Sequence, residues 1–247
     1  MSCRPHYPMS GFILYDKPAG ITSHDVVDRV RRQTGQRCVG HAGTLDPFAT
    51  GLLIVGVGRE ATREFPKLVG LDKIYEATFV LGATSDTDDR TGNITPVPPT
   101  EPLTHKRMEE TLKQFVGEIS QIPPDYSAIK INGQKMYEAA REGKPLEAAP
   151  RKVTIYAIDL LSSHLLLATS PSLLATLPSL LLRIHCSSGT YIRAIARDLG
   201  RALGTGGYVE ELRRTHIGPF SIESADNTRL LTVEPFFDIF NSSLIMH

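Results

Sequence analysis

The chain has 247 residues, of which 41% are hydrophobic and 22% charged, enough apolar material for one sizeable core. Lysines and arginines number 27, and so do aspartates and glutamates, which argues against a protein that holds nucleic acid through bulk charge alone. The three cysteines are too scattered for a disulfide framework and the N-terminus lacks the apolar core of a signal peptide, so we expect a cytoplasmic protein without membrane contact.

Hydrophobic patterning predicts short strands and helices in the first half of the chain. Strands are expected at residues 11–15, 52–57 and 73–82, and helices at 24–34, 61–69 and 104–116. Ser23 is expected to cap the first of these helices, and Gly117 to end the last. The stretch 84–100 is rich in Asp, Thr, Gly and Pro, which predicts a long loop.

The second half shows the same mixture. Strands are expected at residues 127–131, 153–161, 180–186 and 208–217, with helices at 134–141 and 191–203, the latter capped by Thr190. Residues 162–179 are rich in Leu and Ser, which indicates a long hairpin connection or an insertion. Because strands and helices do not alternate strictly, the pattern favours an α+β fold over a doubly wound parallel sheet.

One stretch, residues 40–51, combines three glycines and one proline with a single carboxylate, Asp46. An apolar run follows it, so Asp46 is expected on a stiff loop that leads into a core strand, where catalytic groups tend to lie. Local sequence alone favours the simpler role of an N-cap or Asx-turn residue. His41 and Asp46 are too few ligands for a metal centre.

Six motifs in order resemble the TruB family of tRNA pseudouridine synthases. They lie at residues 16–23, 40–51, 73–75, 123–130, 188–193 and 213–220. The resemblance implies a central mixed, largely antiparallel sheet with flanking helices and loops. It also implies isomerisation of a uridine, in bacterial members uridine 55 of the tRNA T-arm. We expect a monomer that needs no metal, organic cofactor or obligatory protein partner.

Carried over residue by residue, the resemblance assigns catalytic roles to three side chains. The reaction breaks the bond from ribose C1′ to uracil N1, turns the base, and joins C1′ to C5. Asp46 would attack C1′ or the base C6, or stabilise a positively charged ribose, and Arg193 would be its counter-charge. Tyr75 would stack on the target base, a contact worth about 1–3 kcal/mol, although a plain strand tyrosine is the alternative.

The other predicted site residues would contact RNA or line the pocket. The target nucleotide must leave its stack, and His41 would fill the space it vacates. The predicted RNA-binding residues are Lys17, His41, Lys130 and Arg141, and the predicted pocket-lining residues are Tyr126 and Leu212. For the two lysines the alternatives are ordinary exposed side chains or packing of the site. For His41 the alternative is a loop histidine, and for Tyr126 and Leu212 it is core packing. Basic clusters within 29–37, 141–152 and 213–214 would contact the RNA, balanced by an acidic back face with Asp86, Asp88 and Asp89.

The resemblance is incomplete at the C-terminus. We expect a catalytic domain at 1–226 and a tail at 227–247 too short for a full RNA-binding domain, truncated or missing. Three other functions compete: a guide-RNA-dependent synthase of the dyskerin type, an RNA-binding or tRNA-folding module without essential catalysis, and a metal-dependent hydrolase. The short tail argues against the first, the set of Asp46, Tyr75 and Arg193 against the second, and the lack of ligands against the third.

Overall fold

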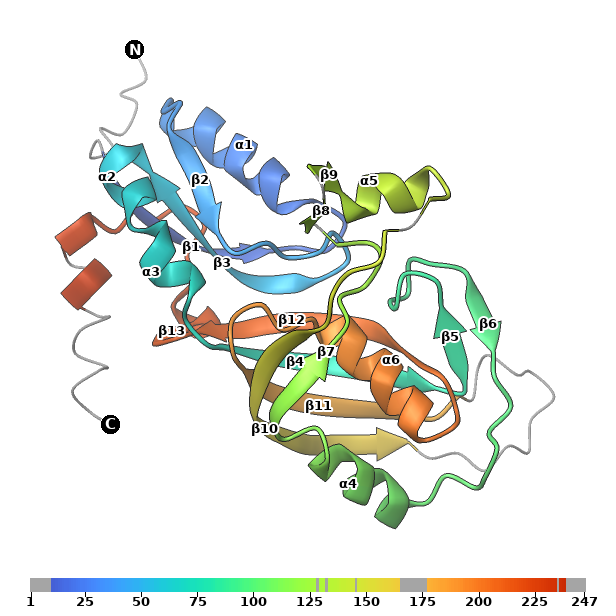
Figure 1. Ribbon diagram of the computed structural model, residues 1–247. Coiled ribbons are helices and arrows are strands. Elements are labelled where there is room, and N and C mark those ends of the chain that lie inside the picture. Colours follow the sequence, from blue (N-terminus) through green and yellow to red (C-terminus); the bar gives the residue numbers. More distant parts are fainter. Residues whose placement is uncertain are drawn as a thin grey trace. The chain divides into compact units, whose positions relative to one another are not determined.

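The computed structural model describes residues 10–127, 129–131, 133–144, 146–164, 177–234 and 236–238. The chain forms two compact units, Met1–Tyr75 with Arg213–His247, and Glu76–Leu212. Each unit combines β-strands with flanking helices, as the α+β prediction requires (Figure 1). Two strands, β4 (Lys73–Leu81) and β12 (Gly207–Ile217), contribute residues to both units.

The first unit is built around β3. Its elements are β1 (Gly11–Lys17), α1 (Ser23–Thr34), β2 (Val39–Ala42), β3 (Thr50–Val57), α2 (Gly58–Arg63), α3 (Phe65–Val69), β13 (Phe220–Ser221) and the 3-10 helix η1 (Ile222–Ser224). β3 pairs antiparallel with β1 and β2, and parallel with the end of β12. The sheet is therefore mixed, as predicted.

Both faces of this sheet are buried. Leu53 and Val55 pack in one apolar layer with the valines of α1, whereas Leu52 and Ile54 pack in the other with residues of α2 and α3. Phe236 completes the second layer, so the described part of the tail packs against this sheet. Because neither face meets water, the sequence of β3 is continuously apolar.

The second unit combines a larger sheet with helices and two short antiparallel hairpins. Its further elements are β5 (Ala83–Ser85), β6 (Ile94–Pro96), α4 (His105–Lys113), β7 (Gly117–Gln121), β8 (Lys130–Ile131), β9 (Gln134–Lys135), α5 (Met136–Arg141), β10 (Arg151–His164), β11 (Ser179–Cys186) and α6 (Ile192–Ala202). The strand order is β12-β4-β11-β10-β7, and β10 is antiparallel to both neighbours. α6 lies against the start of β12, where Gly200 permits the approach: a Cβ there would stand 2.2 Å from the carbonyl carbon of Gly206 (Figure 1).

Both predicted N-caps are wrong. Thr22, one residue before the predicted Ser23, caps α1: its hydroxyl accepts a hydrogen bond from the Asp25 amide, and the Asp25 carboxylate accepts one from the Thr22 amide. The N-cap of α6 is Tyr191, which makes no side-chain capping bond. The predicted cap, Thr190, donates its hydroxyl to the Ser187 carbonyl instead.

The structure also contains short strands that patterning did not predict. The expected loop at 84–100 includes the hairpin of β5 and β6, and Gly117 begins β7 while Gln114 caps α4. Val116, the last residue of the expected helix, lies beyond the end of α4 and is 45% exposed. Such strands are too short, two to five residues, to show a period in the sequence.

Residues 162–179 are described only at their two ends. There β10 and β11 continue, and His164 pairs with Ser179 in an antiparallel register. This is the geometry expected of a hairpin connection; residues 165–176 lie outside the described residues.

Candidate active site

Asp46 lies on the loop between β2 and β3, as predicted, and hydrogen bonds fix the backbone on both sides of it. The Leu45 amide donates to the Ser23 hydroxyl at 2.9 Å, and that hydroxyl donates to the Leu45 carbonyl at 3.1 Å. The Ala49 amide donates to the Asp46 carbonyl at 3.1 Å. Asp46 is half-buried, and neighbouring residues hold the backbone that carries its side chain in place.

Lys17 holds the same loop from within the protein. Its side chain is fully buried, and Nζ donates to the carbonyls of Pro18 at 2.9 Å, Ile21 at 2.8 Å and Pro47 at 3.3 Å. Burial lowers the pKa of Lys17 to about 8, and the charge of Asp46 acts in the opposite direction. Lys17 was predicted to pack the site or to touch phosphate. Only packing agrees with a side chain that is inaccessible to solvent.

Arg214 is a second buried cation beside this loop. Its guanidinium donates to the carbonyls of Leu52 at 2.8 Å, Gly43 at 3.1 Å and Thr44 at 3.3 Å. The prediction of an RNA-contacting cluster at 213–214 is therefore wrong for Arg214. Its neighbour Arg213 forms an ion pair at 2.7 Å with Asp16.

His41 and Tyr75 are the other predicted site residues of the first unit. His41 lies on β2, opposite Val55 of β3, rather than on a loop. Burial lowers the pKa of His41, and the positive charge of Arg214 lowers it further. Tyr75 is buried on β4, next to Ile74, whose carbonyl accepts a hydrogen bond from Thr215.

In the second unit, Arg193 occupies the first turn of α6 and is 3% exposed, so it is not a solvated surface residue. Its guanidinium donates to the carbonyls of Thr87 at 2.8 Å and Tyr126 at 2.9 Å. The Asp89 carboxylate lies 3.5 Å away and is equally buried. The structure thus brings together Arg193 and the backbone of Tyr126, a predicted pocket residue.

A second arginine, one helical turn further along α6, fixes the other side of the 85–92 loop. Arg197 pairs with Asp88 at 3.0 Å and Asp198 at 2.9 Å, and donates to the Ile122 carbonyl at 2.8 Å. Burial raises the pKa of Asp88 to about 6, although the attraction of Arg197 and Arg193 opposes the rise. The predicted acidic back face is wrong for Asp88 and Asp89, since both are buried.

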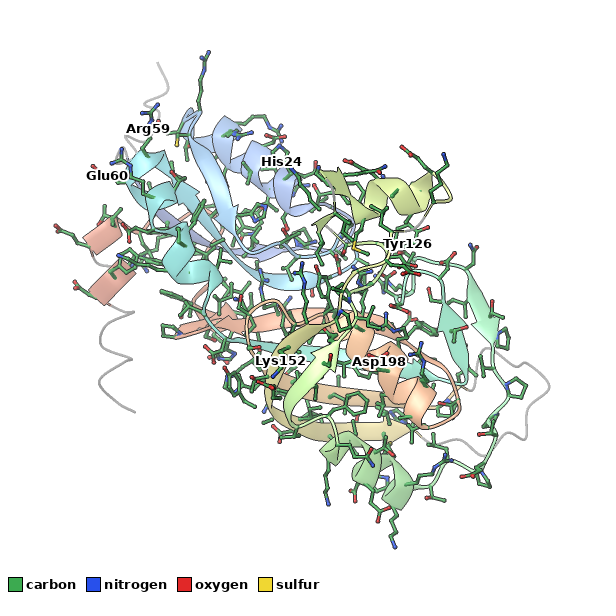
Figure 2. All side chains as sticks on the ribbon, viewed as in Figure 1. His24, Arg59, Glu60, Tyr126, Lys152 and Asp198 are labelled. Atoms are coloured by element: carbon green, nitrogen blue, oxygen red, sulfur yellow. The ribbon has the colours of Figure 1, made fainter. Side chains whose placement is uncertain are left out.

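The remaining predicted residues are distributed over the second unit. Lys130 is exposed on β8, and exposed Arg141 ends α5 with its guanidinium 5.6 Å from the centre of the Tyr137 ring. Leu212 is buried on β12. Figure 2 labels Tyr126 on the segment that leads to β8, and also Lys152 on β10 and Asp198 on α6.

Sequence reasoning gave other roles to three residues that support these sites: Ser23, Arg214 and Asp89. Arg214 carried a signal, because it lies two residues after Leu212 on a strand and so shares its inward face. Asp89 sits in an Asp-rich run that is typical of a solvated loop. The expected pairing of Asp46 with Arg193 joins residues of different units and stays a prediction.

Neither a metal centre nor a membrane span was found in the part of the chain that the structure describes. Those residues include no group of three or more His, Cys, Asp or Glu side chains able to hold a metal ion. No described helix is long and apolar enough to cross a membrane.

Comparisons with known proteins agree with one another. Residues 31–192 match the model of the TruB family pseudouridylate synthase N-terminal domain, and residues 193–242 match that of the tRNA pseudouridylate synthase B C-terminal domain. The chain is 44% identical over 226 residues to the tRNA pseudouridine synthase B of Arthrobacter sp.. The matched region covers 92% of this chain and 72% of that protein. It is 45% identical over 228 residues to the Corynebacterium efficiens protein of the same name, which spans 90% and 74%.

A solved structure supports the same fold. The chain is 31% identical, with a TM-score of 0.62, to a chain in the crystal structure of a Cbf5-Nop10-Gar1 complex. The match covers 92% of this chain and 54% of the solved one, so the present chain spans about half of it.

Proposed function

Because this chain belongs to the TruB family of pseudouridylate synthases, we propose that it converts a uridine of tRNA into pseudouridine. The observation that carries the proposal is the anchored loop around Asp46: side chains of Ser23, Lys17 and Arg214 fix its backbone. A carboxylate on such a loop is pre-positioned for chemistry. The target that the family resemblance favours is uridine 55 of the T-arm.

Each of three side chains takes one part of the isomerisation. Asp46 attacks ribose C1′ or the base C6, or stabilises the ribose cation, once the uridine has left its stack. Tyr75 stacks on the base. Arg193, whose guanidinium is fixed by two backbone carbonyls, supplies the positive charge that keeps the aspartate ionised.

RNA is held by exposed cations. Lys130 and Arg141 belong to this contact surface, with Lys144, Arg151 and Lys152 nearby in sequence and all exposed. These side chains reach phosphate oxygens, and recognition of the T-arm rests on its shape rather than on base edges hidden in its deep groove. His41 takes the space left by the flipped base.

The protein acts without an obligatory protein or guide-RNA partner. The identity to proteins named tRNA pseudouridine synthase B, 44%, exceeds the 31% to the chain solved with Nop10 and Gar1. A guide-dependent enzyme would need added RNA and proteins, whereas a stand-alone enzyme modifies tRNA by itself.

The test is incubation of the purified protein alone with an unmodified tRNA transcript in the presence of a chelator, with pseudouridine read position by position. We expect product in the T-arm from the wild type. We expect at least ~1,000-fold slower formation from Asp46→Asn, as for loss of a catalytic side chain. Asp28→Asn is the control, because Asp28 pairs with Arg31 on the surface of α1.

Three outcomes are informative. No product from the wild type would remove the enzyme proposal and leave the RNA-folding alternative. Product that depends on added guide RNA would favour the dyskerin-type alternative. Equal rates from wild type and Asp46→Asn would remove the assigned mechanism.

A further inference from the structure

Resting on that proposed function, we propose that Arg214 is a positioning residue for Asp46. The Arg214 guanidinium holds the backbone of Gly43 and Thr44 on one side of the catalytic loop and of Leu52 on the other. It therefore connects the two ends of the loop and sets the position of the Asp46 carboxylate. Arg214 itself touches neither substrate nor reacting atoms.

The chemistry of this contact favours a guanidinium. The side chain is 1% exposed, and each hydrogen bond that the structure gives it ends on a neutral carbonyl. A planar fork with five N–H donors reaches carbonyls in two separate segments at once, whereas the ammonium of lysine is a single compact group. A buried cation without a carboxylate in its own hydrogen-bond set is a costly arrangement, which points to a use beyond packing.

The backbone around Arg214 is shaped to bring the loop close. Gly43 and Gly51 have φ of +94° and +107°, conformations that other residues rarely adopt. A Cβ on Gly51 would stand 2.3 Å from the Arg214 carbonyl oxygen, so the start of β3 lies directly against the β12 backbone. The parallel register that pairs Arg214 with Gly51 and Arg213 with Thr50 fixes which arginine faces the loop.

Arg183 is the matched control. It is a strand arginine of β11 whose guanidinium donates to the Glu76 carboxylate at 3.0 Å, and it belongs to none of the predicted RNA-binding clusters. Lysine in its place should keep this ion pair and leave the loop untouched. The loop also has anchors of its own at Ser23 and Lys17, so the loss of Arg214 shifts the loop without removing every support.

The experiment compares Arg214→Lys with Arg183→Lys in three measurements: single-turnover pseudouridine formation on the tRNA transcript, tRNA dissociation constant, and amide hydrogen exchange of Leu45 and Ala49. For Arg214→Lys we expect turnover to fall ~10- to 100-fold, with the dissociation constant within ~2-fold of wild type. Exchange at the two amides should speed up at least ~10-fold. Arg183→Lys should resemble the wild type in all three.

The results decide the proposal in each case. Wild-type turnover in Arg214→Lys, or unchanged amide exchange, overturns it, and so does an equal loss in turnover and RNA binding, which would make Arg214 an RNA contact. If Arg214→Lys is unfolded at the assay temperature, Arg214→Gln is measured instead; if neither folds, Arg214 is a stability residue and the proposal is wrong. Should the wild type form no pseudouridine, the exchange measurement still tests whether Arg214 holds the loop. Failure of this proposal can therefore be distinguished from failure of the proposed function.

Discussion

At the scale of single residues, several charged side chains are buried in both units. Lys17 and Arg214 are enclosed in the first, and Asp88, Asp89 and Arg193 in the second. Burial of a charge costs several kcal/mol unless hydrogen bonds replace its hydration. Backbone carbonyls accept such bonds from the three cations, so these charges are held by the fold itself.

Replacing Arg193 should separate catalysis from binding. For Arg193→Ala we expect turnover to fall at least ~100-fold while the tRNA dissociation constant changes less than ~3-fold, because a side chain 3% exposed does not reach phosphate. Single-turnover rates and filter binding measure the two. A matching fall in both would instead identify Arg193 as a phosphate clamp. Arg193→Lys, which keeps the charge opposite Asp89, guards against misreading an unfolded variant.

Asp88 should make stability depend on pH. Its pKa rises from the usual 3.8 to about 6 on folding, so between these values the folded protein binds the proton more tightly than the unfolded chain. Its contribution to the free energy of unfolding is therefore full below 3.8 and is lost as pH rises through 6. Asn also tolerates the φ of 59° found here.

As the pH is raised from 4 to 7, the free energy of unfolding of Asp88→Asn, measured in urea titrations, should rise relative to that of the wild type by up to about 3 kcal/mol. Parallel pH profiles for the two proteins would contradict the assigned burial effect.

At the scale of elements, the start of α1 shows two adjacent hydroxyl residues with different tasks. Thr22 forms the capping box with Asp25, and Ser23 turns inward to bond both backbone groups of Leu45. The helix thus begins at one residue and anchors the Asp46 loop with the next. A cap is a local contact, whereas the anchor depends on how α1 packs against a loop 22 residues away.

Alanine at each position should separate these tasks. Thr22→Ala should lower the free energy of unfolding by about 1 kcal/mol and leave turnover unchanged, since only the helix cap is lost. Ser23→Ala should lower turnover ~10-fold, because the backbone next to Asp46 loses both bonds. Chemical denaturation and the pseudouridine assay measure the two effects. Equal turnover from both variants would show that the Ser23 anchor does not position Asp46.

At the scale of the whole molecule, binding of tRNA must come from local charge, because the formal net charge is zero. The exposed cations of residues 130–152 form the strongest candidate surface. Raising salt from about 50 to 200 mM should therefore weaken tRNA binding at least ~10-fold. A flat response would rule out these residues as the main contact surface.

Single substitutions refine this prediction. Arg141→Ala and Lys144→Ala should each reduce the slope of log affinity against log salt by about one phosphate contact. Lys106→Ala is the matched control, because Lys106 is an exposed lysine of the same unit on α4, 3.9 Å from Glu110. A slope change of the same size in the control would mean that the effect is one of total charge.

The domain prediction concerns function and stays a prediction. Structurally, the C-terminal residues 213–238 that are described belong with the first unit: β13 pairs with the end of β12, and Phe236 stacks on Phe12 with ring centres 4.0 Å apart. The family model of the C-terminal domain matches residues 193–242, a range that includes residues of both units. The predicted catalytic domain at 1–226 includes residues of both units. The Asp46 and Arg193 variants test whether each unit contributes a catalytic residue.

The sequence by itself determined the family, most strands and helices, and the placement of Asp46 on a rigid loop before a buried strand. These follow from motif order and from periodicities that extend over only a few residues. Only the tertiary structure decided that Ser23 anchors the loop, that Arg214 and Lys17 are buried beneath it, and that Asp88 and Asp89 face arginines of α6. The physical reason is that burial of a polar side chain depends on which distant backbone groups the fold brings within hydrogen-bond reach, as the pairing of Arg214 with Gly51 across 163 positions of the chain shows.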